Sequence, residues 1–234
     1  MMESWLALAR GPVFIAAFSF MVLGLPRHVG ITAWEVARAV HRAGDKNIPY
    51  RKMIAATIGW LIPVGKLWNQ VLFSFTSFLF HAAVLIVPIF LGGHIALWAR
   101  GLGVSWPAVS NPAADVLTIV AIVTAVALVV QRIVSRSTRA LSRFQDYAIP
   151  LVVALPFASG FLLMHPSVNP FTYNATFFVH VMSGNLLFVL IPITKLSHIA
   201  LLPGVQIVSE VAWHWPPDAG SKVAVALGKE SEPI

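Results

Sequence analysis

The feature that most constrains this chain is a series of long apolar stretches, each able to cross a lipid bilayer. A transmembrane helix needs about 20 apolar residues. Only 11% of the 234 residues are charged and 58% are hydrophobic, whereas a soluble domain carries about a quarter charged residues. The sequence therefore predicts an all-α membrane protein, a five-transmembrane-helix bundle. We expect spans at about 5–25, 70–99, 114–131, 148–164 and 175–202.

Prolines disturb helices, and we expect them to affect the shape of two of these spans. The second span is long and holds Pro88, so we expect it to tilt or kink. The fourth span is short and holds Pro150 and Pro156. The charges of Glu3 and Arg10 cancel, no cleavage site of small residues follows the first span, and the positive charge that follows the span begins at Arg27. We interpret it as a retained span rather than a signal peptide.

The loop charges predict the topology. Loops rich in Lys and Arg stay in the cytoplasm, and two loops carry most of the basic residues, whereas the other two are nearly uncharged. This pattern predicts an outside N-terminus and a cytoplasmic C-terminus, in a multi-pass protein of the bacterial cytoplasmic (inner) membrane. The basic residues of these two loops are Arg27, Arg38, Arg42, Lys46, Arg51, Lys52, Lys66, Arg132, Arg136, Arg139 and Arg143.

The chain divides into a five-span domain, 1–202, and a polar cytoplasmic tail, 203–234. Within the cytoplasmic loop 26–69, the stretch ITAWEVARAVHRAG (31–44) predicts an amphipathic helix. This helix could lie on the inner membrane surface or dock a cytoplasmic partner, and the sequence leaves both open. We assign the net charge of +7 to topology and lipid headgroups rather than to nucleic acid.

Four of the eight histidines lie inside predicted spans, which is costly in lipid and indicates function. They are His81 and His94 in the second span and His180 and His198 in the fifth. On an ideal helix, His180 and His198 share one face and lie about 27 Å apart along the axis. His81 and His94 would be about 140° apart around an ideal helix. Pro88 and the pair Gly92–Gly93 could change that register.

The topology pairs these histidines across two antiparallel spans. His94 and His180 would meet near the outer face, and His81 and His198 near the inner face. Two imidazoles, one from each side, are the axial ligands that haem iron can take. The chain has no cysteine, which excludes thiolate-bound iron–sulfur clusters and covalent c-type haem. The sequence therefore predicts two stacked b-type haems, with Gly92, Gly93 and Gly184 making room for them.

The stretch HVMSGNLLFVLIPITKLSH (180–198) resembles the fifth span of the gamma subunit of respiratory nitrate reductase. FHAAVLIVPIFLGGHIALW (80–98) resembles the second span of the cytochrome b subunits of sulfate-reducer transmembrane redox complexes, where RGPVFIAAFSF (10–20) also has a counterpart. In the nitrate reductase subunit the second-span histidines are closer together, so the chain is more similar to the redox-complex branch. The resemblance covers nearly all of the chain through residue 202.

This resemblance implies five spans, two b haems with the four histidines as axial ligands, and a quinone site beside one haem. Arg100 and Gly93 are the nearest equivalents of its quinone-binding residues, for menaquinone or ubiquinone. The resemblance also implies a cytoplasmic iron–sulfur subunit of heterodisulfide-reductase type, and in some members a periplasmic multihaem cytochrome c. The chain would then be an electron-transfer subunit of a quinone-linked oxidoreductase complex.

Several other polar residues have two interpretations. Lys195 could pair with an inner haem propionate, as could Arg139 or Arg143, or their side chains could reach the lipid headgroups. His165 could accept a quinol proton, or simply be solvated. Two other functions remain open: a non-redox membrane anchor subunit, and a transporter that relays protons through histidines. The transporter would need acidic partners inside the spans, where Asp115 at an edge is the main candidate.

Overall fold

The computed structural model describes residues 2–42, 51, 54, 55, 58, 71–201, 224, 225 and 228. About 89% of these residues are helical and none forms a strand, which confirms the all-α prediction. The described residues fall into two compact units, each considered by itself. The first unit takes in residues 2–21 and 71–196, and the second takes in 22–42, 197–201 and the isolated positions 51, 54, 55, 58, 224, 225 and 228. The predicted tail 203–234 lies almost wholly outside the described residues.

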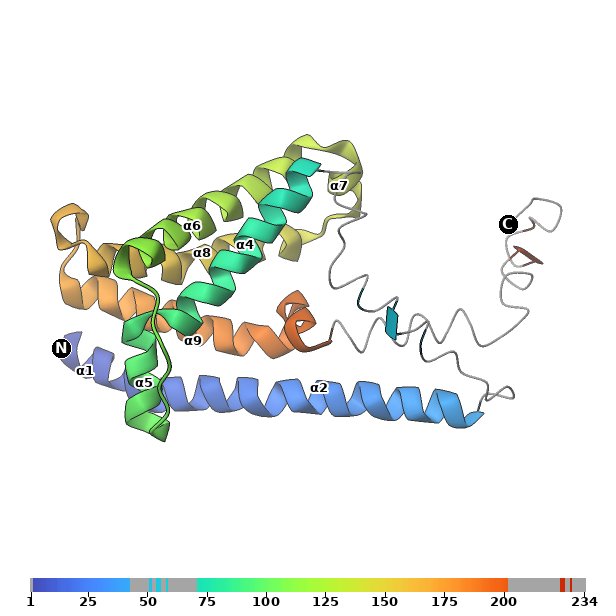
Figure 1. Cartoon of the computed structure of the whole chain (residues 1–234), viewed down its shortest axis with the longest axis horizontal. Coiled ribbons are helices and arrows are strands. Elements are labelled where there is room, and N and C mark those ends of the chain that lie inside the picture. Colours follow the sequence, from blue (N-terminus) through green and yellow to red (C-terminus); the bar gives the residue numbers. More distant parts are fainter. Residues whose placement is uncertain are drawn as a thin grey trace. The chain divides into compact units, whose positions relative to one another are not determined.

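Five helices in the described residues are long and apolar enough to cross a membrane, as predicted (Figure 1). The first begins as α1 (Met2–Leu8), passes through the π-helical turn η1 (Ala9–Val13), and continues as α2 (Phe14–Arg42). The others are α4 (Val71–Phe90), α6 (Asn111–Val134), α8 (Phe144–Met164) and α9 (Tyr173–Ile193). Shorter elements are α5 (Gly92–Leu102), α7 (Arg136–Leu141), η3 (Pro166–Val168) and η4 (Lys195–Ser197).

Three of the predicted boundaries need correction. The second span is not one helix to residue 99, because Leu91 is extended (ψ 128°) and separates α4 from α5. Figure 1 shows α5 leaving α4 at a sharp angle. The fifth span ends as a helix at Ile193, because Thr194 is extended (ψ −175°). The predicted amphipathic helix from residue 31 is helical up to Arg42, but it continues α2 instead of forming a separate element.

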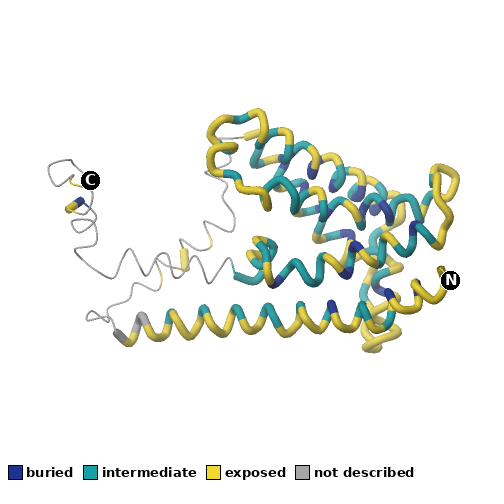
Figure 2. Tube along the Cα trace, turned by 180° about the vertical axis from the view of Figure 1, so that it is seen from behind, coloured by how far each residue is buried: buried dark blue, intermediate teal, exposed yellow. Residues whose placement is uncertain are grey.

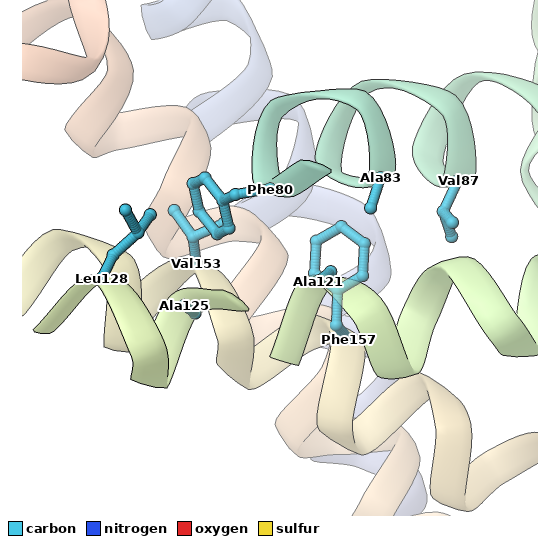
Figure 3. Packing of buried hydrophobic residues seen from close by; sticks show 8 residues of the cluster. All are labelled: Phe80, Ala83, Val87, Ala121, Ala125, Leu128, Val153 and Phe157. Atoms are coloured by element: carbon cyan, nitrogen blue, oxygen red, sulfur yellow. The ribbon is translucent and has the colours of Figure 1, made fainter. Parts of the chain in front are cut away.

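The first unit packs its long helices in the order α4, α6, α8 and α9, and α9 also contacts α1 and η1. Its core joins α4, α6 and α8 (Figure 3). Ala83, Ala121 and Ala125 are almost fully buried, since small residues allow helices in membranes to approach closely. The larger members of this core cluster are Phe80, Val87, Leu128, Val153 and Phe157.

The outward faces of these helices are apolar, as expected for helices that contact lipid. Figure 2 shows exposed residues recurring along α4, α6 and α8. Water-soluble proteins seldom expose large contiguous apolar surfaces, so this exterior fits a protein embedded in a bilayer. The exposed side chains include Leu72, Phe75, Phe78, Val116, Val123, Val130, Leu151 and Leu155.

Candidate functional site

The break at Leu91 positions His94. The last carbonyls of a helix lack partners within that helix, and at the end of α4 each of them finds a donor elsewhere. The imidazole of His94 binds one of these carbonyls, since its Nδ1 lies 3.1 Å from the Pro88 carbonyl oxygen. The other three carbonyls also accept hydrogen bonds: Val87 O from Leu91 N (3.0 Å), Ile89 O from Trp106 Nε1 (2.9 Å) and Phe90 O from Val109 N (3.0 Å).

His180, on α9, is held in a similar way by groups of the neighbouring helix α8. Its Nδ1 lies 2.9 Å from the Pro156 carbonyl and 3.4 Å from Ser159 Oγ. Gly160 sits directly beside the imidazole: a Cβ atom there would lie 3.1 Å from the Cε1 atom of His180. In both histidines, an Nδ1–H that donates to a carbonyl leaves Nε2 with its lone pair, which is the form that binds a metal.

The structure brings the rings of His94 and His180 together, as the sequence predicted. Their centroids are 6.1 Å apart and their planes differ by 12°. Two imidazoles on opposite sides of one metal ion, with Nε2 about 2.0 Å from the metal and about 1.1 Å from its own ring centroid, would have centroids about 6.2 Å apart. The separation of the two ring centroids therefore matches the spacing of two axial ligands on one haem iron. The backbones of α5 and α9 make almost no close contact, so the two helices approach each other here through these side chains.

His81 shares the pattern of the first two histidines. Its Nδ1 lies 2.7 Å from the Ser77 carbonyl one turn earlier on α4, and its ring meets the Phe80 ring edge-on. His198 belongs to the second unit, so its pairing with His81 stays a prediction. The argument that His180 and His198 share one face of a continuous helix is wrong, because α9 ends at Ile193. Within the part of the chain that the structure describes, no three His, Asp, Glu or Cys side chains form a metal-binding group.

The two residues predicted to bind quinone lie on α5, and the structure contains no group that tests this role. Gly93 precedes His94, and a Cβ atom at Gly93 would meet nothing within 4 Å. Arg100 lies in the last turn of α5, and its Nε donates to the Ala96 carbonyl at 3.2 Å.

The residues predicted to bind propionate have protein partners. Lys195 Nζ lies 2.7 and 2.6 Å from the two carboxylate oxygens of Asp146, and Arg139 donates to the Ile133 carbonyl at 2.9 Å. Sequence reasoning did not identify Arg132, which lies over the Phe73 ring and whose Nε is buried with no hydrogen-bond partner among the described residues. Its position in a basic loop gave no sign of this burial.

His165 has an acidic partner that the sequence did not reveal. Its Nε2 lies 3.3 Å from Asp115 Oδ2, and its Nδ1 lies 2.9 Å from the Phe161 carbonyl. Both side chains are about one third exposed. Asp115 is near the start of α6 and His165 directly follows α8, so the two residues join helix ends that are far apart in sequence.

Sequence comparison identifies a relative of this chain in a sulfate reducer. No family model and no solved structure matches the chain. A protein of the sulfate reducer Nitratidesulfovibrio vulgaris, whose name states no function, is 35% identical over 170 residues. The aligned region covers 72% of this chain and 74% of that protein. With this identity over most of both sequences, the chain belongs to the same protein family as the Nitratidesulfovibrio vulgaris protein.

Proposed function

We propose that the chain is a membrane-embedded dihaem cytochrome b, the electron-transfer subunit of a quinone-linked respiratory complex. The single observation that carries the proposal is the His94–His180 pair. Its rings are near-parallel, 6.1 Å apart, and each has its Nδ1 directed at a backbone carbonyl. Two histidines that merely pack against each other need not have near-parallel rings, this centroid distance and an Nδ1–carbonyl contact on each ring at the same time.

Each predicted ligand has a defined task in this proposal. His94 and His180 hold the outer haem b, and His81 and His198 hold the inner one. When bound, the haems supply one-electron transfer across the bilayer. The backbone carbonyls of Pro88 and Pro156 fix the orientation and the tautomer of the outer pair.

The partners follow from the resemblance to nitrate reductase gamma subunits and sulfate-reducer redox complexes. The relative in a sulfate reducer is consistent with that branch. In this proposal the chain lies in the bacterial inner membrane and exchanges electrons with menaquinone or ubiquinone near Gly93 and Arg100. The partners are a cytoplasmic iron–sulfur subunit of heterodisulfide-reductase type and, in some complexes, a periplasmic multihaem cytochrome c.

One observation favours a second candidate function, a histidine-based proton relay. His165 and Asp115 form the kind of histidine–carboxylate pair that a relay requires. The pair lies at helix ends and not along a span, so it favours this function less strongly than the ring pair favours haem.

The test is haem stoichiometry in the detergent-purified protein. We expect a b-type spectrum in the dithionite-reduced minus oxidised difference, and two haems per chain in the pyridine haemochrome assay. Alanine at His94 or at His180 should remove the same haem, and alanine at His81 or at His198 the other one. His41, exposed on α2, provides the matched control, whose alanine variant should keep both haems. A well-folded wild-type protein without haem would overturn the proposal and leave the anchor and the relay.

A further inference from the structure

Gly160 is unusual among the described glycines because a neighbouring side chain needs the space that its missing Cβ leaves. A Cβ there would lie 3.1 Å from Cε1 and 3.3 Å from Nδ1 of His180, which is tighter than nine in ten real contacts of such an atom, so the imidazole would have to shift by a few tenths of an ångström. By contrast, a Cβ at Gly11, Gly93 or Gly184 would meet nothing within 4 Å. The His180 imidazole therefore packs directly against the backbone of α8.

The same turn of α8 supplies both hydrogen-bond acceptors for His180 Nδ1. The Pro156 carbonyl is 2.9 Å away and Ser159 Oγ is 3.4 Å away. The Ser159 hydroxyl donates to the Leu155 carbonyl at 2.8 Å, so its oxygen faces the imidazole as an acceptor. Contact on the ring and two acceptors at one nitrogen restrict both the translation of the ring and its rotation.

We propose that the turn Pro156–Gly160 of α8 is a positioning device that sets the plane of the His180 imidazole relative to that of His94. His94 is oriented independently, by the Pro88 carbonyl at the end of α4. The 12° angle between the two rings thus results from two separate anchors. Gly160 and Ser159 are positioning residues, since they act on the iron only through His180.

This inference rests on the proposed function, and it has a spectroscopic consequence. The angle between two axial imidazole planes splits the iron d orbitals, so a rotated ring changes the low-spin EPR signal. An acceptor at Nδ1 makes the imidazole a stronger electron donor and so stabilises the oxidised iron. The turn should therefore influence both the EPR signal and the reduction potential of the outer haem.

The experiment compares Gly160→Ala, Ser159→Ala and the control Gly30→Ala in the full-length, haem-loaded protein. Gly30 lies on α2, and its added Cβ would meet nothing within 4 Å. We expect Gly160→Ala to shift the EPR signal of one haem, the haem that His180→Ala removes, and to leave the other unchanged. Ser159→Ala should raise the potential of the same haem, and Ser159→Thr, which keeps the hydroxyl, should restore it. Gly30→Ala should change neither haem.

The outcomes separate the two proposals. A wild-type protein without haem would overturn the proposed function and this inference with it. A wild-type protein with two haems, combined with unchanged EPR signals and potentials in Gly160→Ala and Ser159→Ala, would overturn the inference alone. Loss of only the His180-dependent haem in folded Gly160→Ala protein would support it, because the added methyl displaces the ring. If Gly160→Ala does not fold, Ser159→Ala and its threonine counterpart decide the result.

Discussion

Three of the four histidines predicted as ligands direct Nδ1 at a backbone carbonyl, which is the detail that makes them suitable ligands. The carbonyls belong to Ser77, Pro88 and Pro156. A ring held in this way cannot turn freely, and Nε2 keeps its lone pair. Backbone acceptors add no charge to the apolar interior, where a carboxylate in the same place would be costly.

The buried amide of Asn185 provides a prediction at this scale. Asn185 is 3% exposed, and its Nδ2 donates to the Ala9 carbonyl at 2.9 Å. Ala9 opens the π-helical turn η1 (Ala9–Val13), where the regular α-helical hydrogen-bond pattern is interrupted. We expect Asn185→Ala to lower the free energy of unfolding by about 1 kcal/mol, measured by thermal unfolding in detergent. Asn174→Ala, on the exposed first turn of α9, should be neutral. Equal stability of the two variants would contradict a structural role for the hydrogen bond.

At the scale of the elements, the ends of the helices determine where the site residues lie. The interruption at Leu91 turns α5 away from α4 and brings His94 to the Pro88 carbonyl. At the end of α9, Thr194 leaves the helix and Lys195 reaches Asp146 in the first turn of α8. The same carboxylate accepts from the Arg143 backbone N–H at 2.8 Å and so caps α8. One acidic residue thereby stabilises the start of α8 and links it to η4.

The ion pair of Lys195 and Asp146 leads to a prediction that also tests the propionate role of Lys195. If the pair is mainly structural, Lys195→Met and Asp146→Asn should each cost about 1 kcal/mol of stability, because the lysine is half exposed. The double variant should cost less than the sum of the two, and haem content and potentials should not change. These quantities can be measured by unfolding in detergent and by redox titration.

A different pattern would support propionate binding. In that case Lys195→Met alone would lower the content or shift the potential of the inner haem, and Asp146→Asn would leave that haem unchanged. A matched control is Arg136→Met, since Arg136 is exposed at the start of α7.

At the scale of the whole molecule, five spans and the distribution of basic residues predict an outside N-terminus and a cytoplasmic C-terminus. Because the chain has no cysteine of its own, this topology can be tested with single introduced cysteines, which are then the only thiols of the chain that a reagent can label. We expect Ser105→Cys and Ser167→Cys, both exposed in connections between helices, to react with an impermeant maleimide in intact cells. Ala140→Cys, exposed on α7, should react only after the membrane is permeabilised. The reverse accessibility would invert the predicted topology.

The sequence by itself determined the helical class, the five spans and the presence of four histidines inside or at the ends of the spans. Hydropathy and loop charge are local properties, and each span needs only its own composition to partition into lipid. The same local reasoning placed His94 on a disturbed helix, because Pro88 and two glycines lie close to it. It failed for the face shared by His180 and His198, because an ideal helix was assumed through Pro192 and Thr194.

The tertiary structure alone decided which groups meet. It brought the ring centroids of His94 and His180 to within 6.1 Å of each other and packed His180 against Gly160. It also paired Lys195 with Asp146 and His165 with Asp115. None of these partners lies within ten residues of the other, and no composition or periodicity specifies the distance between their helices. That distance depends on how the helices of the first unit pack against one another, and on where each helix ends. Both result from contacts between several helices, which is why the site required the three-dimensional structure.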